Sequence, residues 1–416
     1  MNGYEPLGSP QKKGGRGKWI AIFFVLLMVT AGGAFYLGNV FAYSTGFGGL
    51  VDGEVLDKYK DVDAYEKLFD IRGALYQYYD GEIDDKAMLE GAIKGMTEAL
   101  GDPYTVFMNK EEYDAFNQQS EGEYIGLGIQ VGVRDNKIVV IAPFDGSPAA
   151  KAGIIPGDVI LAVNGTEVSG EDIDLAVSMM KGNDKVPVNL SLFRESKGSF
   201  DVSVTRDTIL MVTVDSEMLE NNIGYISVSS FDEHTDDDFT KALVELKNQG
   251  MKGLILDLRD NPGGLLTTSV SVVSNFIEKG KVVVSTIDKY DKKEVLNSEG
   301  GEAIGLPLVV LVNEYSASAS EIVSGAIRDY EAGTLIGTNT FGKGIVQSVL
   351  TGLGDGTALK VTISKYYTPL GENIHGTGIA PDIEVAYPDE LREQLYDRAK
   401  DPQFTKALEV IKEKLQ

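Results

Sequence analysis

The distribution of apolar and charged residues predicts a membrane anchor near the N-terminus. Residues 19–43, WIAIFFVLLMVTAGGAFYLGNVFAY, contain no charge. A helix of this length, at about 1.5 Å per residue, spans the roughly 30 Å hydrocarbon core of a bilayer. Residues 1–18 are basic and acidic residues follow the apolar run, so the positive-inside rule predicts a single-pass protein of the cell membrane, with a cytoplasmic N-terminus and an extracytoplasmic remainder. A cleaved signal peptide is the alternative, but the run is longer than the usual signal core.

A helical module is expected after a linker over residues 44–60. Between residues 61 and 115, apolar residues recur at spacings of three and four, which is the period of an amphipathic helix. Two sets of residues show this spacing: Leu68, Ile71, Leu75 and Tyr78, and Leu89, Ile93, Met96 and Leu100. A Gly-Asp-Pro sequence ends the second set. The pattern indicates a small module that packs or dimerises.

Residues 120–208 have the pattern of a compact, β-rich domain. Short β-prone runs are separated by Gly, Pro and Asn turns, which is typical of small sheet domains. The runs are LGIQVGV, KIVVIAPF, DVILAVNG and VPVNLSLFR. One helix is expected, over residues 171–181.

Residues 209–388 alternate between strand-like and helix-like segments. The runs IGYISVS, GLILDLR and PLVVLVN are almost continuously apolar, and helical patterns lie between them. This alternation predicts a buried, largely parallel sheet with helical crossovers. Residues 389–416 form a charged helical tail that gives little functional signal.

The composition excludes several classes of function. The net charge of -25 argues against a nucleic-acid partner, because phosphate binding needs clustered basic residues. The chain has no cysteine, so disulfides, thiolate metal sites and a cysteine nucleophile are excluded. Two histidines without metal-ligand spacing argue against a zinc hydrolase. We therefore predict no metal and no other cofactor.

The segment SASASEIVSGAIRD, residues 316–329, offers candidate nucleophiles. It follows the apolar run PLVVLVN and begins a helix, and open α/β sheets place their sites at the carboxyl ends of strands. However, Ser318 and Glu321 have the spacing of a helix capping box, which needs no catalytic role. This stretch alone does not distinguish Ser316, Ser318 and Ser320 as nucleophiles.

A serine that attacks a carbonyl needs a base. His234 lies in an acidic loop and His375 in a turn-rich segment, and neither is next to an obvious orienting acid. Lys343, in TNTFGKGIVQSV, lies between glycines in an apolar setting. A lysine acts as a base only when it is neutral, so burial must lower its pKa from about 10.4. An exposed turn lysine is the alternative interpretation.

Two glycine-containing turns can present backbone N–H groups. The run LDLRDNPGG, residues 256–264, ends a strand before a helix, and its amides, with the amide after a nucleophile, can form an oxyanion hole. An ordinary strand-to-helix turn is the alternative. The second turn, Gly126, Leu127, Gly128 and Ile129, opens the β-rich domain. Its amides can hold the terminal carboxylate of a peptide that adds to the sheet as a strand.

Taken together, these motifs resemble the carboxyl-terminal processing peptidases, which are Ser–Lys serine proteases with an inserted PDZ domain. The resemblance extends from residue 61 to 385. It rests on the two PDZ segments YIGLGIQV and SPAAKAGIIPGDVILAVNG, and on LDLRDNPGG, NEYSASASEIVSGAIRDY, GTNTFGKGIVQ and SKYYTPLGENIHGTGIAPDIEV. With the predicted transmembrane helix, it implies an α+β multidomain fold: helical module, PDZ domain and crotonase-like α/β protease core.

The resemblance also implies roles for particular residues. Ser318 would be the nucleophile, Lys343 the general base and Gln347 the residue that orients the lysine. The oxyanion hole would combine the Ala319 amide with that of Gly263 or Gly264. In an extended strand Lys343 and Gln347 would lie about 13 Å apart, so their contact requires a turn or helical conformation. One departure is the sequence MKGNDK, where relatives often carry an arginine before the glycine.

The expected function is that of a membrane-anchored, extracytoplasmic serine endopeptidase. It would cleave exported proteins near their C-termini, and its PDZ domain would bind substrate tails and gate activity. Whether the chain forms a homodimer is left open. An inactive scaffold that only binds C-terminal tails is the main alternative, and the joint presence of the serine, lysine and glutamine argues against it. A trypsin-like protease lacks its histidine here, and an acyl-CoA enzyme of the crotonase type lacks a nucleotide-binding signature.

Overall fold

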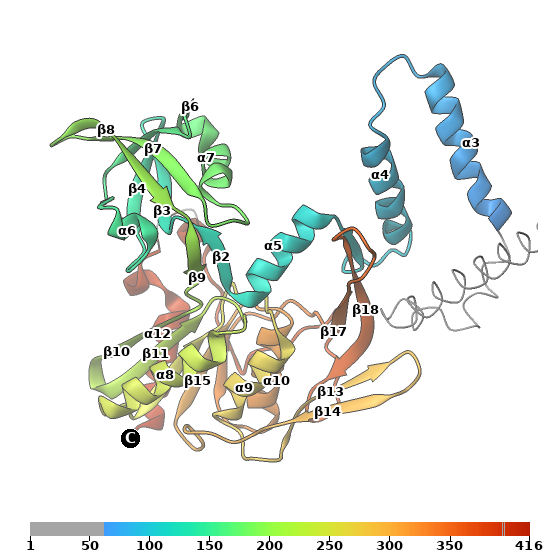
Figure 1. Cartoon of the computed structure of the whole chain (residues 1–416). Helices are drawn as coiled ribbons and strands as arrows, with labels where there is room; N and C mark the ends of the chain where they lie inside the picture. The colour runs from blue at the N-terminus through green and yellow to red at the C-terminus, as the bar shows by residue number, and fades with distance from the viewer. Residues whose placement is uncertain (1–61, 393, 395) are drawn as a thin grey trace, which may run out of the picture. The chain divides into compact units, whose positions relative to one another are not determined.

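The computed structural model describes residues 62–392, 394 and 396–416 (Figure 1). The predicted cytoplasmic segment, membrane anchor and linker, residues 1–60, lie outside the described residues. No helix among the described residues has both the length and the apolar character that a bilayer crossing requires. The chain divides into two compact units, with residues up to Asp102 and Leu350–Leu359 in the first, and Pro103–Val349 and Lys360–Gln416 in the second.

The first unit contains the two predicted helices, α3 (Val62–Tyr78) and α4 (Asp85–Glu98). Asp84 begins α4, because its side chain accepts a hydrogen bond from the Ala87 N–H. The helical periodicity read from the sequence is confirmed, since both apolar sets fall mainly on these helices. Most of those apolar side chains are exposed.

The β-rich domain in the second unit is a sheet of six strands. Alternate residues of β7 point into its core: Val188, Leu190 and Leu192 are buried, whereas Phe193 is exposed. This is the period-2 pattern of a strand with one buried face. The main path of the sheet has the order β3 (Ile129–Arg134), β4 (Lys137–Pro143), β5 (Val159–Val163), β7 (Pro187–Arg194) and β8 (Gly198–Thr205), with β6 (Thr166–Glu167) beside β5. The helices are α6 (Pro148–Lys151) and α7 (Ile173–Met180).

A two-stranded antiparallel ribbon joins this domain to the rest of the second unit. Strand β2 (Glu123–Gly126) enters the domain and β9 (Asp207–Leu210) leaves it, and the two strands pair with each other. Helix α5 (Lys110–Glu121) leads into the ribbon. The domain is therefore an insertion whose entry and exit lie side by side.

The core of the second unit is a six-stranded sheet that is buried on both faces. Along β15, Leu308, Val310 and Val312 pack into one apolar cluster, and Val309 and Leu311 pack into another. The order is β10 (Val214–Leu219), β11 (Ile223–Val228), β12 (Gly253–Asp257), β15 (Leu308–Val312), β16 (Thr334–Gly337) and β19 (Ile383–Glu384). Only the β10–β11 pair is antiparallel among these strands. The predicted parallel sheet is thus confirmed.

Helices cover both faces of this sheet (Figure 1). Helices α8 (Thr235–Asn248), α9 (Leu266–Ser274) and α10 (Ala319–Asp329) pack on one face, and α12 (Pro402–Lys414) packs on the other. A second sheet contains β1 (Val106–Met108), β18 (Ala358–Tyr367), β13 (Val282–Asp288) and β14 (Lys293–Asn297), with β17 (Ile345–Leu350) beside β18. Two short helical segments, α11 (Asp389–Arg392) and 3-10 residues Arg398–Lys400, precede α12.

The C-terminal tail is an integral part of the core. Asp401 is completely buried and begins α12 by accepting hydrogen bonds from the N–H groups of Gln403 and Phe404. The same carboxylate accepts a hydrogen bond of 2.7 Å from Arg259 Nη1, and Arg259 also pairs with Asp257. One largely buried guanidinium therefore links the tail to the end of strand β12.

Replacement of Asp401 by alanine is expected to destabilise the fold strongly. The variant loses the N-cap of α12, which contributes about 0.5–2 kcal/mol, and a charge-assisted hydrogen bond to Arg259, which contributes about 1.5–3 kcal/mol, while Arg259 keeps Asp257 as a partner. Urea unfolding followed by circular dichroism measures this loss. The matched control is Glu409→Gln on the same helix, which breaks an exposed pair with Lys406 and should leave the midpoint unchanged. Equal midpoints for the Asp401 variant and the wild type would contradict the assigned role of the pair.

Candidate active site

The structure distinguishes the three serines that the sequence left equivalent. Ser316 and Ser320 are completely buried. The Ser316 hydroxyl donates to the Leu258 carbonyl at 2.7 Å, and the Ser320 hydroxyl donates to the Asn261 carbonyl at 3.0 Å. Both hydroxyls thus tie the loop to the neighbouring strand-to-helix turn. Ser318 is instead half-buried and lines a cavity.

Ser318 has a strained backbone at the junction between β15 and α10. It is the N-cap of α10, with φ 55° and ψ -110°. A non-glycine residue in this region costs about 1–3 kcal/mol, and such residues cluster at active sites. The turn therefore presents Ser318 at the carboxyl edge of the sheet, where sites of open α/β folds lie.

The cavity at Ser318 has a volume of about 580 Å³ and brings together the predicted catalytic residues. They come from three separate segments: Gly263 with Gly264, Ser318 with Ala319, and Lys343 with Gln347. Apolar side chains form much of the wall, including those of Phe116, Leu266, Ile322, Ile345 and Val346. Neither His234 nor His375 lines this cavity, which favours Lys343 over histidine as the base.

Glycine is required at both positions of the turn beside Ser318. Gly263 has φ 104° and Gly264 has φ 145°, a region that side chains rarely adopt. A Cβ on Gly263 would lie 2.8 Å from the Ala317 oxygen, and one on Gly264 would lie 2.1 Å from the Phe231 oxygen. Gly263 therefore allows the turn to approach the Ser318 segment closely, and Gly264 allows it to approach the backbone of Phe231.

The two glycine amides of the turn are used differently. The Gly263 N–H donates to Asn261 Oδ1 at 2.8 Å. The N–H groups of Gly264 and Ala319 donate to no acceptor within the described part of the chain. Ala319 is the first residue of α10, and the first amides of a helix have no partner within the helix. Two uncommitted donors therefore lie beside the serine.

Lys343 is half-buried in the irregular segment before β17. Its backbone N–H donates to Glu321 Oε2 at 2.9 Å, and its Nζ lies 4.7 Å from the centre of the Tyr104 ring. The alternative of an exposed turn lysine is thus wrong, although the amine faces an aromatic ring in this conformation.

Gln347 lies on strand β17, so the chain from Ile345 onward is extended rather than turned or helical. Its Nε2 is buried and has no hydrogen-bond partner among the residues that the structure describes. Gln347 and Lys343 nevertheless line the same cavity. The Gln347 side chain can therefore form a hydrogen bond with a group that moves toward it inside the cavity.

The predicted carboxylate loop lies at the edge of the β-rich domain. Gly126 ends β2, Leu127 is buried, Gly128 has φ 70°, and Ile129 begins β3. The N–H groups of Leu127 and Gly128 donate to no acceptor in residues 62–392, 394 and 396–416. The adjacent groove between the loop and α7 has a volume of only about 30 Å³, and Lys181 Nζ lies 4.5 Å from the Tyr124 ring centre at its rim.

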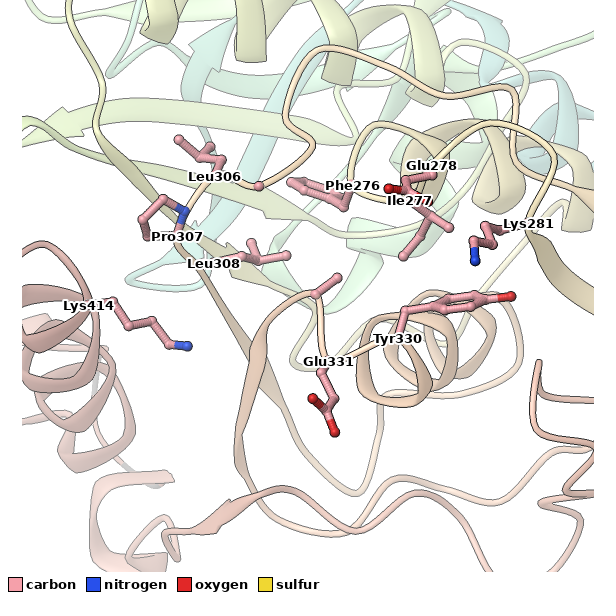
Figure 2. A pocket seen from close by; sticks show the side chains of 12 residues that line it. Phe276, Ile277, Glu278, Lys281, Leu306, Pro307, Leu308, Tyr330, Glu331 and Lys414 are labelled. Carbon is pink, nitrogen blue, oxygen red and sulfur yellow. The ribbon is translucent and has the colours of Figure 1, made fainter.

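A second cavity of about 580 Å³ lies at the opposite, amino-terminal edge of the core sheet (Figure 2). Leu308, the first residue of β15, contributes to its lining, together with Lys281, Tyr330 and Lys414. No serine, threonine or histidine lines it. It therefore offers no nucleophile with a base, and the Ser318 cavity is the candidate active site.

A strained serine, uncommitted amides and a lysine in one cavity define the site of a serine hydrolase, and comparison with known proteins identifies the family. Residues 222–385 match Peptidase family S41, residues 139–193 match the PDZ domain, and residues 27–112 match the N-terminal domain of the activating protease CtpB. The chain is 42% identical over 312 residues to the carboxy-terminal processing protease CtpA of Bacillus subtilis, and 35% identical over 334 residues to CtpB of that organism.

These matches cover 75% and 79% of this chain, and 66% and 69% of the two relatives, so the chain spans about two thirds of their length. A solved structure from Bacteroides fragilis, described as an S41 protease, has a TM-score of 0.51 at 17% identity, covering 81% of this chain and 93% of that one. That likeness shows the fold alone. The chain belongs to the carboxy-terminal processing proteases of family S41, which are serine peptidases. The resemblance read from the motifs is thereby confirmed.

Proposed function

We propose that this protein is a membrane-anchored, extracytoplasmic endopeptidase that cleaves exported proteins near their C-termini with a Ser318–Lys343 pair. The observation that carries the proposal is the convergence of Ser318, Lys343 and two uncommitted amides in one cavity. The uncharged run over residues 19–43 supports the anchor, and the charge pattern around it supports the orientation. The exposed apolar residues of α3 and α4 support a homodimer.

In the proposed reaction the neutral Lys343 amine takes the proton of the Ser318 hydroxyl as Oγ attacks the peptide carbonyl. The protonated amine then gives this proton to the leaving nitrogen as the C–N bond breaks, and water hydrolyses the acyl-enzyme. An aromatic ring attracts a protonated amine, so the conformation in which Nζ faces Tyr104 precedes catalysis. Rotation of the lysine toward Ser318 brings it to Gln347, whose side-chain oxygen accepts a hydrogen bond from the amine and leaves the nitrogen lone pair free to take the serine proton.

The oxyanion hole is assigned to the amides of Gly264 and Ala319. The Gly263 amide is excluded because its N–H already donates to Asn261. Two preorganised donors that point at the developing charge stabilise the transition state more than the ground state. Asn261 therefore holds the turn while Gly264 supplies the donor.

The substrate is proposed to be a protein with an accessible C-terminus. The Leu127 and Gly128 N–H groups of the PDZ domain are free to donate to its carboxylate, and the apolar wall of the cavity suits an uncharged residue at the scissile bond. The narrow groove at this loop requires α7 and the loop to separate before a tail binds. This opening is the step through which the PDZ domain would gate activity.

Amidation of the substrate C-terminus should lower kcat/KM by about 10-fold or more, because hydrogen bonds to a charged group contribute about 1.5–3 kcal/mol. The experiment compares a peptide and its amide as substrates of the full chain. Cleavage of the free acid alone supports the proposal. Equal rates would contradict capture of the carboxylate, and binding without cleavage of either peptide would establish the inactive scaffold.

A further inference from the structure

The carboxylate of Glu321 is completely buried and is surrounded by donors. Its Oε2 accepts hydrogen bonds from the N–H groups of Ser318 at 2.8 Å and Lys343 at 2.9 Å. Its Oε1 accepts from the Gly342 N–H at 2.7 Å and the Thr340 hydroxyl at 2.6 Å. Four donors on two oxygens suit an ionised carboxylate, which is acceptor-only.

Helix capping explains only one of these four bonds. In a capping box, the acidic residue at the third helical position accepts a hydrogen bond from the N-cap N–H, which here is that of Ser318. The other three donors belong to residues 340–343, about 20 residues further along the chain and outside helix α10. A burial this complete is unnecessary for a cap, since capping side chains work at exposed helix ends.

The two segments that Glu321 joins both have unusual backbones. Ser318 has φ 55° and Gly342 has φ 91°, and residues 341–344 form no helix or strand. Glycine adopts a positive φ readily, whereas the strained backbone of Ser318 persists only when surrounding contacts over-determine it. The Glu321 carboxylate supplies such contacts to the backbone of the nucleophile and to the backbone of the base at the same time.

We propose that Glu321 is a positioning residue that fixes the backbone of Lys343 against that of Ser318. The proposal rests on the Ser318–Lys343 function proposed above. Glu321 does not line the cavity, so it acts through the two residues that it holds. A misplacement of about 1 Å between reacting groups can cost about 100-fold in rate, which makes this bridge a direct determinant of kcat.

The test is Glu321→Gln in the full-length protein. Glutamine has the same shape as glutamate, but its NH₂ group would replace one carboxylate oxygen. A donor would then face the two donors that this oxygen now accepts from. We expect kcat for peptide cleavage to fall by about 100-fold and KM to stay within about threefold, as for loss of an arrangement needed in the transition state. The rate constant for labelling Ser318 with a fluorophosphonate should fall in parallel, whereas a loss of folded protein would lower only the amount labelled.

Glu372→Gln is the matched control, because Glu372 is half-exposed and pairs with Arg328 on the surface. It should leave kcat, KM and labelling unchanged. A folded Glu321→Gln protein with kcat within threefold of the wild type would overturn the proposal, as would a change confined to KM.

If the Glu321→Gln variant does not fold, Thr340→Val removes one of the donors to the Glu321 carboxylate, and should lower kcat several-fold with KM retained. An unchanged kcat in Thr340→Val would then overturn it.

Failure of this inference is distinguishable from failure of the proposed function. If Ser318→Ala cleaves peptides normally, the assignment of the site is wrong whatever Glu321→Gln does. If Ser318→Ala is inactive but folded Glu321→Gln is fully active, the site stands and only the positioning role of Glu321 is lost.

Discussion

Replacement of Ser318 by alanine is expected to abolish peptide cleavage while the protein stays folded. Loss of the nucleophile in a serine protease lowers kcat by on the order of 10⁴- to 10⁶-fold, since only the oxyanion hole and substrate binding remain. Peptide hydrolysis by the purified full chain measures this effect, and circular dichroism reports the fold. Alanine keeps the Cβ and the backbone conformation of Ser318, so the substitution gives no reason for the variant to unfold.

The matched control is Ser203→Ala, which removes an exposed hydroxyl from β8 of the PDZ domain. It should cleave peptides at the wild-type rate. Activity retained by Ser318→Ala would show that another group attacks the peptide bond, and the site would have to be reassigned.

Replacement of Lys343 by arginine is expected to remove nearly all activity without removing the positive charge. The guanidinium has a pKa above about 12 and cannot accept the serine proton. General-base catalysis contributes about 10²- to 10⁴-fold, so kcat should fall within that range or further. Arginine also stacks on aromatic rings, so the contact with Tyr104 is retained and the loss reports proton transfer.

The wild-type rate should depend on pH in the direction that a lysine base requires. Only the neutral amine accepts a proton, so kcat/KM rises as the pH rises and the amine is deprotonated. A flat profile between about pH 6 and 10, or an arginine variant with wild-type kcat, would contradict the role of Lys343 as the base.

Much of the fold could be read from the sequence because burial leaves a periodic signal. The run PLVVLVN predicts a strand covered on both faces, and the structure places its alternate residues in two separate apolar clusters. The C-terminal tail was harder to interpret. Its charged residues hide the amphipathic face of α12, and nothing in the sequence shows that Asp401 meets Arg259.

The site was only partly predictable because hydrogen bonding depends on three-dimensional geometry. The motif suggests Gly263 or Gly264 as a donor to the oxyanion. The choice between them depends on Asn261, whose side-chain oxygen accepts a hydrogen bond from the Gly263 N–H. The spacing of Ser318 and Glu321 predicts a cap, and the sequence gives no sign that the same carboxylate reaches Lys343. Gln347 lies on an extended strand. The four-residue spacing between Lys343 and Gln347, which suggested a turn or a helix, therefore does not predict how the two side chains meet.

Transfer of the Ser318 proton to the Lys343 amine can be tested with a crystal structure in which a peptide boronic acid is bound to the serine. We expect Lys343 Nζ to leave the Tyr104 ring and to lie within about 2.6–3.2 Å of Ser318 Oγ. An adduct on Ser318 with the amine still against Tyr104, out of reach of the serine, would contradict it.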